Sequence, residues 1–288
     1  MPFAPPLDPL TRVGRRGHVK LAFERRGRRT VQTSSSAASP WHVFPPSELD
    51  DSGCAYVWLV NTSGGLVGGD QVSLEASLAA DSHVLMTTPS ATRVYRTLDA
   101  PVEQTIHLSV GQNARLEWIP EVTIPFAGSR FRQSISADLA PGAAALVWDA
   151  TASGRVARDE RWAFASFENE ICLTTASGDS VVERFRVEPD RPGHRWSIVS
   201  EWDYVASAFV IGDQVPTEVW TRMEEAIAVL LEQWPGQVLG GVSTTAAPGL
   251  AIKIVARAAP SLALAQEAVW SCVRAHLWQL PPIALRRY

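Results

Sequence analysis

Most of this chain alternates hydrophobic and polar residues with a period of two. Between about residues 18 and 211, short runs place every second side chain on one face. Such runs include Val72, Leu74, Ala76 and Leu78, then Ile106, Leu108 and Val110, then Phe131, Ile135, Ala137 and Leu139, with Gln133 as an interruption. This is the pattern of strands with one buried face. Because turn-forming glycine, proline and aspartate residues separate the runs, the pattern predicts a mainly β, antiparallel body.

Helical periodicity is confined to the end of the chain. One helix is expected at about 217–234, after Pro216 and before Pro235, and a second at about 261–278. The apolar positions of the first helix recur every three or four residues, as on the buried face of an amphipathic helix. Two further strands are expected between the helices, at 238–242 and 250–255. We therefore expect two α-helices near the C-terminus to pack on the β body.

The sequence contains no linker that would divide it into independent domains. Residues 1–16 hold proline, arginine and glycine without a sustained period, which predicts a flexible N-terminal arm. Residues 17–288 are interpreted as a single β domain that includes the C-terminal helices. No internal repeat of fixed period is visible.

Composition restricts the classes of partner. The 288 residues are 46% hydrophobic and 19% charged, with a formal net charge of −4, so a folded protein without a nucleic-acid partner is expected. The basic stretch from Arg12 to Arg29 is interpreted as a solvated segment. No run approaches the roughly 20 apolar residues that cross a bilayer. Three widely separated cysteines predict no disulfide framework, and a cytoplasmic location is therefore expected.

The most distinctive segment is rich in glycine. It contains Gly64, Gly65, Gly68 and Gly69. Gly64 and Gly69 have the separation of a phosphate-binding P-loop, but Asp70 and Gln71 stand where that motif needs lysine and a hydroxyl residue. A carboxylate there would repel a triphosphate, so nucleotide binding is not expected. Paired glycines also permit a tight connection between strands, whatever else the segment does.

Several motifs in register resemble the UreD (UreH) family of urease accessory proteins. The glycine segment 64–70 is followed by Leu85–Arg96, which ends in Val94, Tyr95 and Arg96. Further matches lie at 116–121, 124–125, 148–149, 154–155 and 182–184, and the resemblance covers residues from about 18 to 280. It identifies Gly64, Gly65, Gly68, Gly69, Tyr95 and Arg96 as a structural motif.

The resemblance implies a fold and a set of partners. The family has a helicoid β body with two helices near the C-terminus, and its members are not enzymes. They bind apo-urease and the accessory protein UreF and, through UreF, the nickel-carrying GTPase UreG. The resemblance therefore implies a scaffold for nickel insertion, with transient nickel(II) and no tightly bound cofactor. A homodimer of the whole complex is compatible with it.

Three carboxylates fall on the hydrophobic face of their predicted strands. Asp70 shares the parity of Val72, Asp149 that of Val147, and Glu183 that of Val181. An isolated buried carboxylate is costly, so each must be paired, protonated, hydrated or beside a cation. They could line a wet passage in which oxygen ligands hold a divalent metal loosely. The resemblance places them at acidic positions of the family's proposed nickel tunnel. Alternatively, Asp70 caps the glycine turn and Glu183 pairs with an arginine.

Other chemistry has little support in the sequence. None of the six histidines lies at short ligand spacing from another histidine or a cysteine, and Cys54 has no local signature of a nucleophile. Glu117 and Glu121 are secondary candidates for the metal path. Two alternative functions stay open. One is a β-rich hydrolase that uses the three carboxylates as acid and base; the other is an interaction module in which all three are salt-bridged or exposed.

Overall fold

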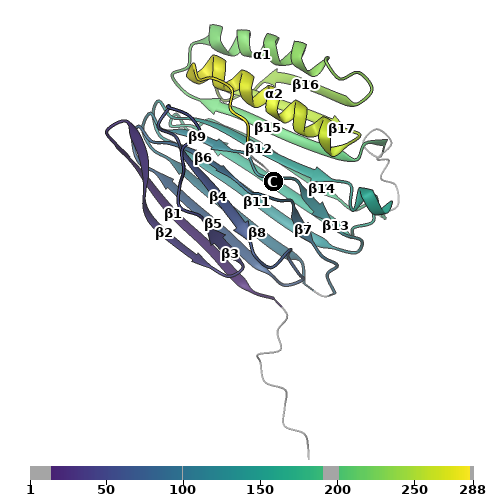
Figure 1. The fold of residues 1–288 in the computed structure, drawn as a ribbon. Helices are drawn as coiled ribbons and strands as arrows, with labels where there is room; N and C mark the ends of the chain where they lie inside the picture. Colours follow the sequence, from purple (N-terminus) through teal and green to yellow (C-terminus); the bar gives the residue numbers. More distant parts are fainter. Residues whose placement is uncertain (1–13, 99, 191–200, 286–288) are drawn as a thin grey trace, which may run out of the picture.

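Two β-sheets lie face to face, and two helices cover the outer face of the second sheet (Figure 1). The computed structural model describes residues 14–98, 100–190 and 201–285. In order across the first sheet lie β14 (Ser180–Val187), β13 (Ser166–Thr174), β11 (Arg130–Leu139), β8 (Val102–Val110), β5 (Gln71–Leu78), β1 (Arg16–Arg26) and β2 (Arg29–Ala38).

The second sheet has the longer path. In order it contains β16 (Val238–Thr244), β17 (Gly249–Ala256), β15 (Tyr204–Gly212), β12 (Ala144–Ala152), β9 (Arg115–Trp118), β6 (His83–Thr87), β4 (Ala55–Asn61) and β3 (Trp41–Val43). Two short strands, β7 (Thr92–Val94) and β10 (Thr123–Pro125), pair beside β12. A single 3-10 turn is described at Val156–Arg158.

The middle of each sheet is parallel, which corrects the antiparallel expectation. The chain crosses between the sheets, so β5, β8, β11 and β13 stack in parallel in one sheet, and β4, β6, β9 and β12 do so in the other. Antiparallel pairs flank the first sheet, at β1 with β2 and at β13 with β14. In the second sheet they join β12, β15, β17 and β16 on one side and β3 with β4 at the other end. Alternation along a strand reveals its buried face but not the direction of its neighbour. The mainly β, helicoid body is confirmed.

The turns of this coil are unequal in length. Leu74, Ile106, Ile135 and Ile171 stand opposite one another on β5, β8, β11 and β13. They are 32, 29 and 36 residues apart in the sequence. This spread explains why a regular coil leaves no fixed repeat in the sequence.

The predicted helices and the strands between them are confirmed. Helix α1 (Thr217–Leu231) ends three residues before the expected limit, and α2 (Ala259–Trp278) begins two residues early. The buried side of α1, with Trp220, Met223 and Ile227, packs on the second sheet, and each such side chain contributes roughly 1.5–3 kcal/mol on burial. A separate core fills the space between the sheets.

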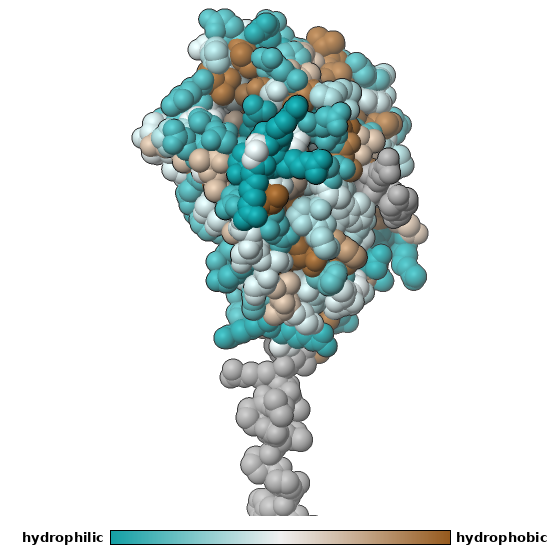
Figure 2. Space-filling view, turned by 60° about the vertical axis from the view of Figure 1, so that its left-hand side comes forward, coloured by the Kyte–Doolittle hydropathy of each residue, from teal (hydrophilic) through white to brown (hydrophobic). Residues whose placement is uncertain are grey.

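The surface and the start of the described chain show few distinctive features. The face turned forward in Figure 2, which includes the β1–β2 side, is mostly hydrophilic, with hydrophobic residues in small separate groups. Strand β1 begins at the last residue of the predicted arm, whose first 13 residues lie outside the described ones. Among the helices that the structure describes, none is long and apolar enough to span a membrane.

Candidate functional site

The glycine segment is fastened to the strand that leads to Tyr95. The N–H of Leu66 donates to the Arg93 carbonyl, and the N–H of Tyr95 donates to the Leu66 carbonyl, each over 2.8 Å. The Tyr95 hydroxyl donates to the Gly64 carbonyl over 3.3 Å. A Cβ atom at Gly65 would lie 2.5 Å from the Tyr95 ring. This close approach requires glycine, so Gly64, Gly65 and Tyr95 of the motif predicted from the resemblance lie in contact.

Asp70 caps this segment. One of its carboxylate oxygens accepts the N–H of Arg15 over 2.8 Å, and the other accepts the N–H of Val67 over 2.9 Å. The residue is buried, as its strand parity predicted, and Gly69 before it adopts a φ of +85°. Two backbone donors thus hold the carboxylate, and within residues 14–98, 100–190 and 201–285 no cation forms an ion pair with it. Asp70 does not line the cavity that the other two predicted carboxylates share. Arg96 is exposed, and its side-chain stem lies over Gly128.

Asp149, on β12, is buried among neutral partners. The Nε2 atom of Gln133 donates to one carboxylate oxygen over 2.9 Å, and the Nδ2 atom of Asn169 donates to the other over 3.0 Å. Within the described part of the chain, no cation forms an ion pair with it. Burial raises the pKa of Asp149, although the two hydrogen bonds and the charge of Lys253 act in the opposite direction.

The amides that hold Asp149 form a ladder across three parallel strands. Gln104, Gln133 and Asn169 stand in register on β8, β11 and β13. Gln104 donates to Gln133 over 2.8 Å, and Gln133 donates to Asn169 over 2.9 Å. The Oε1 atom of Gln104 is buried and has no hydrogen-bond partner among the described residues. The polar interruption at Gln133 therefore belongs to a stripe of amides that points at a buried carboxylate.

Glu183 lies on the edge strand β14 and faces the second sheet. Its carboxylate accepts the Ser207 hydroxyl over 2.7 Å and forms an ion pair with Lys253. Lys253 also donates to the Ser207 hydroxyl over 2.9 Å and lies over the Phe209 ring. Its side chain is 48% exposed. The rest of the side chain is buried, and this burial lowers the pKa of Lys253 to about 8, although the charge of Asp149 acts in the opposite direction.

A cavity of about 220 Å³ brings Asp149 and Glu183 together. Its wall also contains Lys253 and Ser207, and aromatic residues including Phe164 and Phe167 complete it. Of the three carboxylates predicted from parity, the structure therefore gathers two in one space. Glu183 is paired, as the alternative interpretation allowed, but with a lysine rather than an arginine.

Two smaller cavities follow this one, each sharing wall residues with the cavity before it. Asp149 also lines a space of about 20 Å³ between the sheets, together with Thr88 and Gln104. Thr88 in turn lines a space of about 40 Å³ beside Gly64 and Gly65. The three cavities thus form a row from Lys253 to the glycine segment, and each shares wall residues with the next. Glu121 lies on the middle cavity, as a secondary candidate on this path would.

A second cluster escaped the sequence analysis. Cys54, His83 and Glu117 offer ligand atoms within 4.8 Å of one another. Cys54 directly precedes β4, His83 begins β6 and Glu117 lies on β9, and these strands belong to successive turns of the coil. Ligand spacing within one segment cannot reveal such a group, because the three positions are 29 and 34 residues apart.

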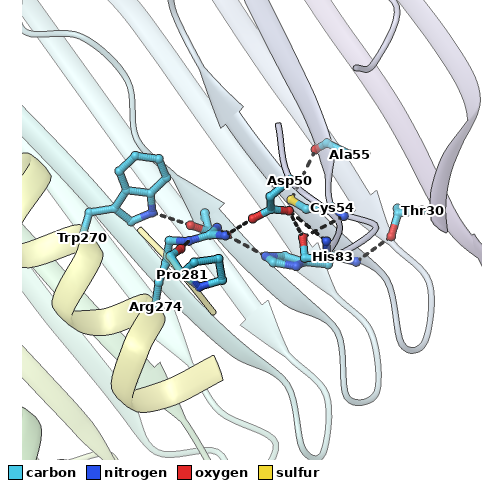
Figure 3. Close-up of polar contacts among 10 residues, drawn as sticks. Thr30, Asp50, Cys54, Ala55, His83, Trp270, Arg274 and Pro281 are labelled. Carbon is cyan, nitrogen blue, oxygen red and sulfur yellow. Dashed lines mark hydrogen bonds and ion pairs between the residues drawn. The ribbon is translucent and has the colours of Figure 1, made fainter. Parts of the chain in front are cut away.

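Helix α2 closes this cluster (Figure 3). The Glu117 carboxylate is hydrogen-bonded to His83 over 2.6 Å, accepts the Arg274 guanidinium over 2.7 Å and accepts the Trp270 indole N–H. Arg274 also donates to Asp50 over 2.5 Å. Burial alone would raise the pKa of Glu117, but the His83 ring, Arg274 and Trp270 together hold that pKa below its usual value.

These contacts do not fit a metal site. The guanidinium of Arg274 already holds the cation position beside Glu117. Burial raises the pKa of the Cys54 thiol well above its usual value, and a thiol is a poor ligand until it loses its proton. We therefore interpret the cluster as a polar anchor between α2 and the β body.

Comparisons with known proteins agree with the motifs. Residues 15–287 match the model of the UreD urease accessory protein family. The chain is 33% identical to a urease accessory protein UreD of Deinococcus radiodurans over 280 residues, which are 96% of this chain and 97% of that protein. It is 30% identical to a urease accessory protein UreD 2 of Streptomyces griseus subsp. griseus, over 94% of this chain and 93% of the relative. A UreD of Cupriavidus necator is 26% identical over 89% of this chain and 88% of its own length.

Proposed function

Because this chain belongs to the UreD family of urease accessory proteins, and so takes part in urease maturation, we propose that it is a non-catalytic scaffold that guides nickel into apo-urease. Its partners would be apo-urease, UreF and, through UreF, UreG. The match extends over nearly the whole of the chain and of its relatives, which supports a role for the entire protein.

The nickel path is proposed to run past Asp149 and Glu183. The observation that carries this proposal is the burial of Asp149 among neutral amides, on a wall shared by two cavities. A buried carboxylate without a paired cation is unfavourable, and a passing divalent ion would relieve that state. Carboxylate, amide and hydroxyl oxygens bind nickel less tightly than imidazole or thiolate, which suits transfer.

The middle cavity would control the passage. A space of about 20 Å³ holds roughly one water molecule. A metal ion there must exchange its water for oxygens of the wall, and the unpartnered oxygen of Gln104 is available for this exchange. Asp70 holds the glycine segment, whose Gly64 and Gly65 line the next cavity. Its role as a ligand stays a prediction.

The two alternative functions have less support. A hydrolase built on all three carboxylates needs them in one cleft, but Asp70 lies outside the shared cavity, and the family is one of accessory proteins. A plain interaction module predicts that all three are exposed or salt-bridged. Asp149 is neither, because it is buried and bound by amides.

Co-expression with a urease operon tests the path. The double variant Asp149→Asn, Glu183→Gln should lower the nickel content and activity of urease by about tenfold or more, as loss of metal-orienting groups commonly does. Co-purification of urease and UreF must stay intact. Glu75→Gln, at an exposed ion pair with Lys20, is the matched control and should leave both readouts unchanged.

Full nickel loading by the double variant would refute the path, and full loading without this chain would refute the scaffold. Asp70→Asn, measured alongside, tests Asp70 separately.

A further inference from the structure

Lys253, which lines the cavity of about 220 Å³, is one of only two lysines in the sequence. Lysine and arginine together number 26, but only Lys20 and Lys253 are lysines. Lys20 forms an exposed ion pair with Glu75, on the outside of the first sheet. Lys253 instead joins strands of the two sheets, because it lies on β17 and pairs with Glu183 on β14.

The ammonium of Lys253 occupies a position suited to a metal ion. It is bound by a carboxylate and a hydroxyl, which are the oxygen ligands that hard cations prefer. It lies over the Phe209 ring, with 4.7 Å between Nζ and the ring centroid, and it shares the cavity wall with Asp149. Two carboxylates and one lysine ammonium therefore meet in a single space, and a second cation there would be repelled by the first.

We propose that Lys253 is a built-in competitor of the metal, whose ammonium a divalent cation must displace toward solvent to reach Glu183 and Asp149. This inference rests on the proposed nickel path. Lysine suits the role because it is a compact charge on a flexible stem, whereas arginine would hold a carboxylate through a rigid two-pronged contact. Since 48% of the side chain is already exposed, the displaced ammonium can enter water without crossing the core.

Nickel binding to the purified full-length chain, measured by equilibrium dialysis, tests the competition. Lys253→Met should bind nickel(II) about tenfold or more tightly than the unaltered chain, because a nearby positive charge has been removed. Lys20→Met is the matched control and should bind as the unaltered chain does. Adding Glu183→Gln to Lys253→Met should abolish the gain. If Lys253→Met binds nickel no more tightly than the unaltered chain, the inference is wrong.

Labelling of the unaltered chain gives a second readout that needs no variant. An amine-reactive reagent can modify both lysines, and mass spectrometry then reports each one separately. Nickel(II) should increase the labelling rate of Lys253 severalfold and leave that of Lys20 unchanged. If dialysis shows bound nickel while Lys253 labelling stays constant, this inference fails and the path survives. If neither the unaltered chain nor Lys253→Met binds nickel, the path fails as well.

Discussion

At the scale of single residues, the two buried carboxylates Glu117 and Asp149 differ in the groups that balance their charge. Glu117 is held by His83, Trp270 and Arg274, so its charge is compensated by two hydrogen-bond partners and a guanidinium. Asp149 is also buried but is held by neutral amides on the wall of a cavity. The same side-chain chemistry thus stabilises the fold at one position and leaves an unmet charge at the other. This contrast is the physical basis for assigning the metal path to Asp149.

Neutralising Glu117 should destabilise the protein strongly. Glu117→Gln removes one of the two carboxylates that Arg274 pairs with and leaves Asp50 as the other, and breaking a buried ion pair costs about 3–5 kcal/mol of unfolding free energy. Urea unfolding at pH 7 measures the change. Glu75→Gln, at an exposed pair, should cost less than about 1 kcal/mol. Equal effects of the two substitutions would contradict the anchoring role.

The contribution of Glu117 should also depend on pH. Its pKa in the folded protein lies below the ordinary value, so the folded state favours the ionised form. The stabilisation is complete above the unfolded-state pKa of about 4.3 and is lost as the pH falls through the folded-state pKa. The difference in unfolding free energy between the unaltered chain and Glu117→Gln should therefore shrink below about pH 4.3. A difference that stays constant down to pH 3 would show that the charge is not responsible.

At the scale of elements, α2 does more than cover a sheet. It buries Leu262, Val269 and Val273 against the second sheet. From the same helix, Trp270 and Arg274 both bind Glu117 on β9 (Figure 3). Apolar burial supplies most of its stability, whereas the two polar contacts fix its position along the strands.

Removing α2 should expose the outer core of the second sheet. A chain that ends at Ala258 should bind a hydrophobic dye strongly and lose cooperative urea unfolding, because the apolar face beneath α2 meets water. A chain that ends at Leu285 keeps α2 and serves as the control. Cooperative unfolding of the shorter chain at the usual urea concentration would show that the sheets do not need the helix.

At the scale of the whole molecule, the coil joins residues that are far apart in the sequence. Each turn adds one strand to each sheet, so stripes of in-register side chains run across the strands. The core between the sheets and the amide ladder beside Asp149 are both stripes of this kind. Turn lengths can vary as long as the register of the strands is preserved.

Insertions should therefore be tolerated in turns but not in strands. One extra glycine after Gly178, in the exposed β13–β14 turn, should shift the melting temperature by no more than a few degrees. One extra residue after Ser134, within β11, would turn Ile135 and the following core residues toward solvent and should prevent folding. Circular dichroism during heating compares the two variants. A folded β11 variant would contradict this account of the register.

The sequence by itself determined the local structure. Its period-two runs identified the strands and buried faces, its helical periods gave both C-terminal helices, and its motifs identified the family. Parity also placed Asp70 and Asp149 inside, because the side-chain direction of a strand follows from local geometry alone. The polar interruption at Gln133 was visible in the sequence, but its place in the amide ladder beside Asp149 was not.

Only the tertiary structure decided which local elements meet. The parallel stacking, the separation of Asp70 from the cavity shared by Asp149 and Glu183, and the pairing of Glu183 with Lys253 all depend on the path of the chain through space. So does the group of Cys54, His83 and Glu117, which then proved to be closed by Arg274. Contacts between residues 29 to 157 positions apart have no local signature, because they form only when the turns of the coil and α2 pack together.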